Sequence, residues 1–171
     1  MVMGMSLSAF TVLHVVLSLV GLAAGIVVAA GFVTSRPMPG ITALFLVTTL
    51  LASLTGLAFP SARFGLGHQL GIVSVLVLLP TAAALYVQHL AGAWRWIFTT
   101  GVLTVLWLNG VIGIFQAYAK LAVLQPSARP EIVNATQLVL FAIFVALALL
   151  AARRFHPEIY RERRWRRLAH W

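Results

Sequence analysis

Apolar residues fall into five long runs, separated by short segments that contain proline, glycine or arginine. A run of about 20 apolar residues is long enough to cross the hydrocarbon core of a bilayer as an α-helix. The pattern predicts membrane-spanning helices over residues 7–33, 41–59, 67–89, 95–121 and 132–153. We therefore expect an all-α transmembrane bundle of five helices within residues 1–155, followed by a basic amphipathic segment over residues 156–171.

The composition agrees with a polytopic membrane protein. Hydrophobic residues make up 61% of the 171 positions and charged residues only 9%, which is far from the composition of a soluble domain. The chain contains no cysteine, so disulfides, thiolate metal sites and thiol nucleophiles are excluded. Residues 1–10 contain no Lys or Arg, so the first apolar run lacks the charged region of a signal peptide and is expected to be a retained span.

Arginines near the C-terminus predict the orientation of the chain. They are Arg153, Arg154, Arg161, Arg163, Arg164, Arg166 and Arg167. Positively charged segments remain on the cytoplasmic side, so we expect a cytoplasmic C-terminus and, with five spans, an N-terminus outside. The basic segment over 156–171 is expected to lie on anionic lipids at the cytoplasmic surface, and nucleic-acid binding is not expected.

Polar residues recur on one face of the fourth span, at Asn109, Gly113, Gln116 and Lys120. Intervals of four, three and four residues return to the same side of an α-helix. An amide facing lipid is costly, so this face is expected to point toward other helices, a water-filled cavity or a ligand. Gly113 is expected to let a neighbouring helix approach closely, as are Gly21 and Gly25 in the first span.

The expected orientation places most polar residues of the spans in the outer half of the bundle. They are His14, Ser53, His68, Gln69, Asn109, Gln116, Lys120, Asn134 and Gln137. Together with Gly113, these residues predict a polar small-molecule or cofactor pocket that opens outward. Hydrogen bonds between helices are the alternative use of the same groups.

Several chemistries fit such a pocket. His14 and His68 are candidate axial ligands of a haem b, and a quinone head group or a transported substrate would use the amides and Lys120. The acidic residues are only Glu131, Glu158 and Glu162, so carboxylate pairs and carboxylate-rich metal sites are not expected within the spans. The sequence assigns no catalytic residue, no metal and no enzyme class.

Three functions remain open at this stage. The first is electron transfer linked to haem or quinone through the outer pocket. The second is a non-catalytic accessory or assembly subunit, whose polar and small-residue faces dock helices of a partner or of a second copy. The third is a small transporter, for which Pro80 in the third span is the one sign of a broken helix.

Three segments carry a resemblance to a known family. They are Leu13-His14-Val15-Val16-Leu17-Ser18, His89-Leu90-Ala91-Gly92-Ala93-Trp94-Arg95-Trp96-Ile97, and Leu108-Asn109-Gly110 to Phe115-Gln116-Ala117. In these segments the chain resembles an uncharacterised family of small bacterial polytopic membrane proteins, over residues 10 to 155. The resemblance implies a bacterial source and a place in the cytoplasmic (inner) membrane, and it implies no activity. The chain departs from the membrane cytochromes b, since it lacks two histidine pairs that would hold haems near both faces.

Overall fold

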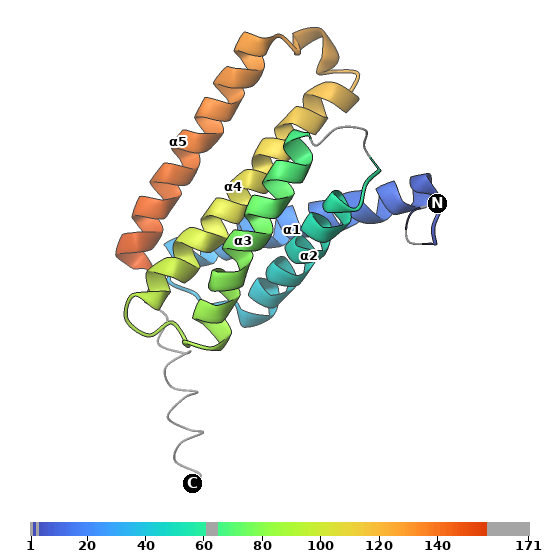
Figure 1. Cartoon of the computed structure of the whole chain (residues 1–171). Coiled ribbons are helices and arrows are strands. Elements are labelled where there is room, and N and C mark those ends of the chain that lie inside the picture. Colours follow the sequence, from blue (N-terminus) through green and yellow to red (C-terminus); the bar gives the residue numbers. More distant parts are fainter. Residues whose placement is uncertain (1, 3, 61–64, 157–171) are drawn as a thin grey trace.

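The computed structural model describes residues 2, 4–60 and 65–156, and all its regular elements are helices (Figure 1). Five are long, and they are α1 (Leu7–Val33), α2 (Pro39–Leu57), α3 (Leu66–Tyr86), α4 (Trp94–Lys120) and α5 (Pro130–Arg154). A short 3₁₀ helix, η1 (Gln125–Ser127), lies between α4 and α5. Each long helix is long and apolar enough to cross a membrane, which confirms the predicted all-α architecture. The basic segment predicted over 156–171 lies, except for His156, outside the described residues.

Local sequence signals explain where the helices begin and end. The side chain of Ser6 accepts a hydrogen bond from the backbone N–H of Ala9 at the start of α1, which is the usual role of an N-cap serine. Helices α2 and α5 both begin at a proline, whose fixed φ suits the first helical position. Helix α3 ends at Tyr86, three residues before the predicted boundary. His89 and Leu90 have φ values of 49° and 58°, so the backbone turns there instead of continuing the helix.

The chain packs most tightly at one end, which we call the Trp96 end: the α1–α2 and α3–α4 connections and the C-terminal end of α5. The rings of Phe32, Phe98 and Phe155 form a cluster there, with centroids 4.7 Å apart for Phe32–Phe155 and 5.6 Å apart for Phe32–Phe98. Arg95 donates a 2.7 Å hydrogen bond from Nη1 to the carbonyl oxygen of Phe155. These contacts join α1, α4 and the residue that follows α5.

Glycines permit the close packing of α1, α2 and α4. A Cβ added to Gly25 would lie 2.5 Å from Cδ1 of Leu106 and 2.7 Å from Cε2 of Phe45. A Cβ on Gly21 would lie 3.0 Å from Oγ1 of Thr49. Both glycines are buried, so the small-residue face of the first span points into the bundle as predicted. The close approach of helices that small residues allow is the usual basis of packing in a lipid environment.

Packing is looser at the opposite end, which we call the Lys120 end: the start of α1, the α2–α3 connection and the α4–α5 connection. The buried residues of α4 all lie between Phe98 and Leu108, and none follows. Toward its N-terminus α1 runs away from α4 and α5 (Figure 1). Only Val133 and Ala151 are buried in α5. The core of the bundle therefore sits at the Trp96 end.

Candidate functional site

His14 is half-buried on α1 and hydrogen-bonded to α2, with Nδ1 2.9 Å from Oγ1 of Thr55. The single hydroxyl proton of Thr55 is directed to its own helix, since Oγ1 donates to the carbonyl oxygen of Leu51 at 2.8 Å. With that proton donated to Leu51, Oγ1 accepts from His14, so we assign the imidazole proton to Nδ1. In the neutral ring, Nε2 then carries the lone pair. His14 is thus oriented to present a basic nitrogen.

The surroundings of His14 are compact. The ring of Phe59 meets it edge-on with centroids 5.2 Å apart, and a Cβ on Gly56 would lie 3.3 Å from Cε1 of His14. The imidazole of His14 thus packs against Thr55 and Gly56 of α2. This arrangement is an interhelical contact between α1 and α2 in which the histidine is a hydrogen-bond donor.

The other candidate haem ligand, His68, lies in the first turn of α3 and is half-buried. Gln69 beside it is exposed. Ser53 on α2 is buried, and its carbonyl oxygen faces α3, 3.5 Å from the position of a Cβ on Gly71. Haem binding by His14 and His68 remains a prediction. No group of three or more His, Cys, Asp or Glu side chains that could hold a metal ion occurs among the described residues.

The polar face of α4 changes its surroundings along the helix. Asn109 is half-buried, whereas Gly113, Gln116 and Lys120 are exposed. No atom lies within 4 Å of a Cβ added to Gly113. The expectation that a neighbouring helix approaches closely at Gly113 is therefore wrong for the single chain. Toward its N-terminus, α1 runs away from α4 (Figure 1). The close approach occurs at Gly110, where Leu140 of α5 would lie 3.1 Å from an added Cβ.

The polar residues of α5 divide in the same way. Gln137 is half-buried and donates from Nε2 to the carbonyl oxygen of Val111 on α4 at 3.1 Å. Asn134, one turn earlier, is exposed. Near Gln137, Thr136 contributes a second link to α4 through its hydroxyl, 3.2 Å from that of Tyr118. The structure thus brings Gln137 to α4 and leaves Asn134 on the surface.

Three buried polar atoms of α4 and α5 have no hydrogen-bond partner among the described residues. They are Nε1 of Trp107, Nδ2 of Asn109 and Oε1 of Gln137. Trp107 packs edge-on against Phe141 of α5, with centroids 5.7 Å apart, so its indole belongs to the same helix pair. Buried polar atoms without partners are uncommon, and among the described residues three of the four such side-chain atoms lie on α4 and α5, the fourth being Oγ1 of Thr49 on α2.

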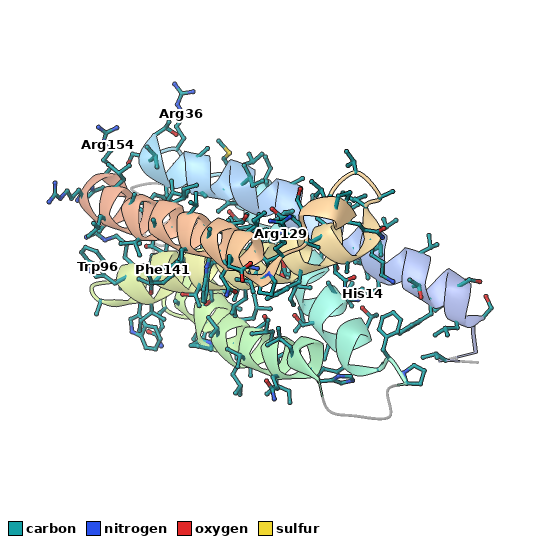
Figure 2. All side chains as sticks on the ribbon, turned by 90° about the horizontal axis from the view of Figure 1, so that it is seen from above. His14, Arg36, Trp96, Arg129, Phe141 and Arg154 are labelled. Carbon is teal, nitrogen blue, oxygen red and sulfur yellow. The ribbon has the colours of Figure 1, made fainter. Side chains whose placement is uncertain are left out.

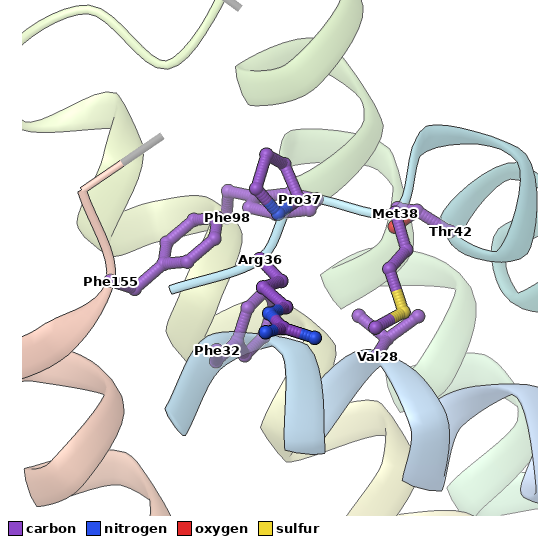
Figure 3. A pocket seen from close by; sticks show the side chains of 8 residues that line it. All are labelled: Val28, Phe32, Arg36, Pro37, Met38, Thr42, Phe98 and Phe155. Carbon is purple, nitrogen blue, oxygen red and sulfur yellow. The ribbon is translucent and has the colours of Figure 1, made fainter. Parts of the chain in front are cut away.

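Two cavities at the Trp96 end are formed by described residues. The first is beside the α1–α2 connection, where Arg36, Met38 and Phe155 contribute to its wall (Figure 3). Its volume of about 10 Å³ is close to the least that a single water molecule needs. The second is a groove of about 220 Å³ between α4 and α5, near Trp96. Neither is lined by any of the residues predicted to form the outer pocket.

Two important contacts were missed by sequence reasoning. Thr55, the partner of His14, lies on α2 in a face of small and hydroxyl residues that carries no distinctive pattern. The hydrogen bond from Arg95 to Phe155 joins residues 60 positions apart. The Trp94-Arg95-Trp96 segment signals a membrane interface, but only the folded chain shows what the guanidinium binds. Both contacts depend on tertiary packing.

Comparison with known proteins gives no relative. No protein-family model matches the chain, and no curated protein or solved structure shows significant similarity to it. Functional inference therefore rests on the chemistry and geometry of the residues themselves.

Proposed function

We propose that this chain is a multi-pass protein of a bacterial inner membrane that acts as a non-catalytic accessory or assembly subunit. In this proposal the α4 surface formed by Gly113, Gln116 and Lys120 binds a transmembrane helix of a partner membrane protein. The N-terminus is outside and the C-terminus is in the cytoplasm, so the surface lies in the outer half of the membrane.

The open space beside Gly113 carries this proposal. Every other glycine of the long helices, apart from Gly40 and Gly67 in first turns, has a neighbouring atom within 4 Å of its added Cβ. A glycine inside a helix costs about 1 kcal/mol relative to alanine, and within this chain Gly113 gains no close contact in return. Small residues in membrane helices serve close approach between helices. With a partner helix packed at Gly113, this glycine would allow close packing between helices, as the other helical glycines do.

The depth of Gln116 supports the same surface. Twenty residues separate Trp96 from Gln116, which is about 30 Å along the helix. With Trp96 at one membrane interface and an average helix tilt, Gln116 lies just inside the opposite boundary of the hydrocarbon core. Its amide can both donate and accept, so a polar side chain or carbonyl of a neighbouring helix can bind it. Lys120, one turn further, reaches the surface.

The orientation follows from the distribution of cationic residues. Arg36, Arg95, Arg153 and Arg154 lie at the Trp96 end, and the sequence after His156 contains five more arginines. Lys120 and Arg129 lie at the other end. The positive-inside bias then favours the Trp96 end as cytoplasmic. Reporter fusions at residue 171 test this, because a periplasmic signal would contradict the assignment.

A crosslinking experiment in native membranes tests the partner surface. A photoreactive residue at Gln116 is expected to give one adduct of defined mass, with the partner identified by peptide mass spectrometry. The matched control is a photoreactive residue at Val139, which is 60% exposed on α5. The adduct at Gln116 should disappear when Gly113→Leu fills the open space. Equal adducts at both positions, or an adduct that persists in Gly113→Leu, would contradict the proposal.

A cofactor pocket is the second candidate, and the hydrogen bond between Nδ1 of His14 and Thr55 favours it, because the assigned Nδ1–H tautomer leaves the lone pair on Nε2. A histidine whose Nδ1–H is fixed by a hydrogen bond is oriented for ligation through Nε2. An absorption spectrum of the purified protein separates the two candidates. A haem Soret band that disappears in His14→Ala and His68→Ala, but not in His89→Ala, would support a cofactor protein and overturn the accessory function.

A further inference from the structure

We infer that the groove between α4 and α5 is a binding site for one anionic glycerophospholipid, independent of the partner surface at Gly113. The groove has a volume of about 220 Å³. Its walls include Trp96, Thr100 and Leu103 from α4, and Val145, Ala148 and Ala152 from α5.

The groove presents an apolar lining although two threonines contribute to it. The hydroxyl of Thr100 donates to the carbonyl oxygen of Trp96 at 2.6 Å, and that of Thr99 donates to the carbonyl oxygen of Arg95. Both hydroxyls are therefore satisfied within α4, and the rest of the lining is hydrocarbon or indole. Such a surface favours an acyl chain over a polar ligand.

Small side chains on α5 create the groove. Ala148 and Ala152 are one turn apart on α5 and both line it, so they form a continuous low strip facing α4. The larger side chains of Val145 and Leu149 complete the α5 wall. The lining runs from Trp96 to Leu103 on α4 and from Val145 to Ala152 on α5, about 10 Å along the helices, which is long enough for part of an acyl chain.

Cationic groups lie where the head group of such a lipid would be. The guanidinium of Arg95 is held near the end of the groove by its bond to the carbonyl oxygen of Phe155, with Cζ 4.9 Å from the Trp96 ring centroid. A guanidinium has five N–H donors, so after the hydrogen bond to Phe155 Arg95 has further N–H groups that can bind a phosphate. Arg153 and Arg154 follow Ala152 directly and are exposed, and Figure 2 shows Trp96 and Arg154 at the same end of the molecule. This arrangement selects a lipid with a net negative charge.

Native mass spectrometry of the full-length, delipidated protein in detergent tests the site. Titration with phosphatidylglycerol and phosphatidylcholine of the same chain length should show tighter first binding of phosphatidylglycerol. Arg153→Gln should weaken phosphatidylglycerol binding by about fivefold, the usual effect of one basic residue near a membrane surface. It should leave phosphatidylcholine binding unchanged. Arg129→Gln, at the opposite end, is the charge control and should change neither affinity.

Filling the groove tests the acyl-chain part of the site. Ala148→Leu should weaken binding of both lipids, whereas Ala146→Leu, an exposed position on α5 outside the groove, should not. If Ala148→Leu fails to fold, Ala152→Leu fills the same groove. Equal affinity for the two lipids in the wild-type protein would overturn the inference. Identical behaviour of the groove variant and Ala146→Leu would overturn it as well.

Discussion

At the Trp96 end, the rings of Phe32, Phe98 and Phe155 pack against one another. The guanidinium of Arg95 there donates a hydrogen bond to the backbone carbonyl oxygen of Phe155. At the Lys120 end, α1 diverges from α4 and α5, and Gln116 is left exposed. The tightest packing of the bundle therefore lies at the Trp96 end, and the proposed partner surface lies at the Lys120 end. Each long helix is apolar enough to cross a membrane, so this difference shows that such a helix need not be packed along its whole length.

The largest expected effect comes from truncating the aromatic cluster. Phe98→Ala should lower the free energy of unfolding by about 3 kcal/mol, near the lower end of the range for buried phenylalanine. The loss is at the lower end because the Phe98 side chain of the unfolded protein contacts lipid instead of water, so packing is lost but little hydrophobic transfer energy. Phe98 is 1% exposed, whereas Phe115 at the Lys120 end is 40% exposed. Phe115→Ala should change stability little. Unfolding in mixed detergent micelles measures both variants, and similar losses would contradict the division between the two ends.

A pair of glycine substitutions compares the packing of the two ends with a smaller expected change in stability. Gly25→Ala should cost about 1–3 kcal/mol, the usual effect of overpacking a filled core, because its Cβ would overlap the Leu106 and Phe45 side chains. Gly113→Ala meets open space and should stabilise the isolated chain by up to about 1 kcal/mol through helix propensity. The same unfolding assay shows whether each substitution raises or lowers the free energy of unfolding. A destabilised Gly113→Ala would mean that this face already packs within the single chain.

The smallest expected effect concerns His14. Thr55→Val removes the acceptor of the Nδ1–H and should cost about 0.6 kcal/mol, typical of a hydrogen bond between membrane helices. Nitrogen-15 NMR of labelled histidine should show the Nδ1–H tautomer in the wild-type protein and a mixture of tautomers in Thr55→Val. An Nε2–H tautomer in the wild type would contradict the assigned donor and remove the oriented lone pair.

The fold was largely predictable because each span carries its own signal. Apolar runs and the prolines at residues 39 and 130 locate the helices within a few residues. The early end of α3 was not predictable, since nothing in the sequence requires positive φ at His89 and Leu90. Helical periodicity correctly grouped Gly21 with Gly25 on a buried face.

The candidate site was less predictable, because periodicity gives the side of a helix but not what covers it. Asn109 and Gln116 share a face of α4, yet Asn109 is half-buried and Gln116 is exposed. Gln137 and Asn134 share a face of α5, yet only Gln137 is half-buried, and it binds α4 through the carbonyl oxygen of Val111. The partner of His14 depended on how α1 crosses α2, which no local pattern encodes.

The sparse packing of α5 has a consequence for biosynthesis. Chains enter the membrane in order of synthesis, so α5 joins helices that have already left the ribosome. Only two of its residues are buried, and its contacts with α4 through Gln137 and Phe141 are absent while the first four helices wait for it. When α5 arrives, the carbonyl group of Phe155 reaches Arg95, and this bond forms only after the whole helix has been threaded across. The junction of α1, α4 and Phe155 at the Trp96 end can therefore be completed only after α5 has crossed the membrane.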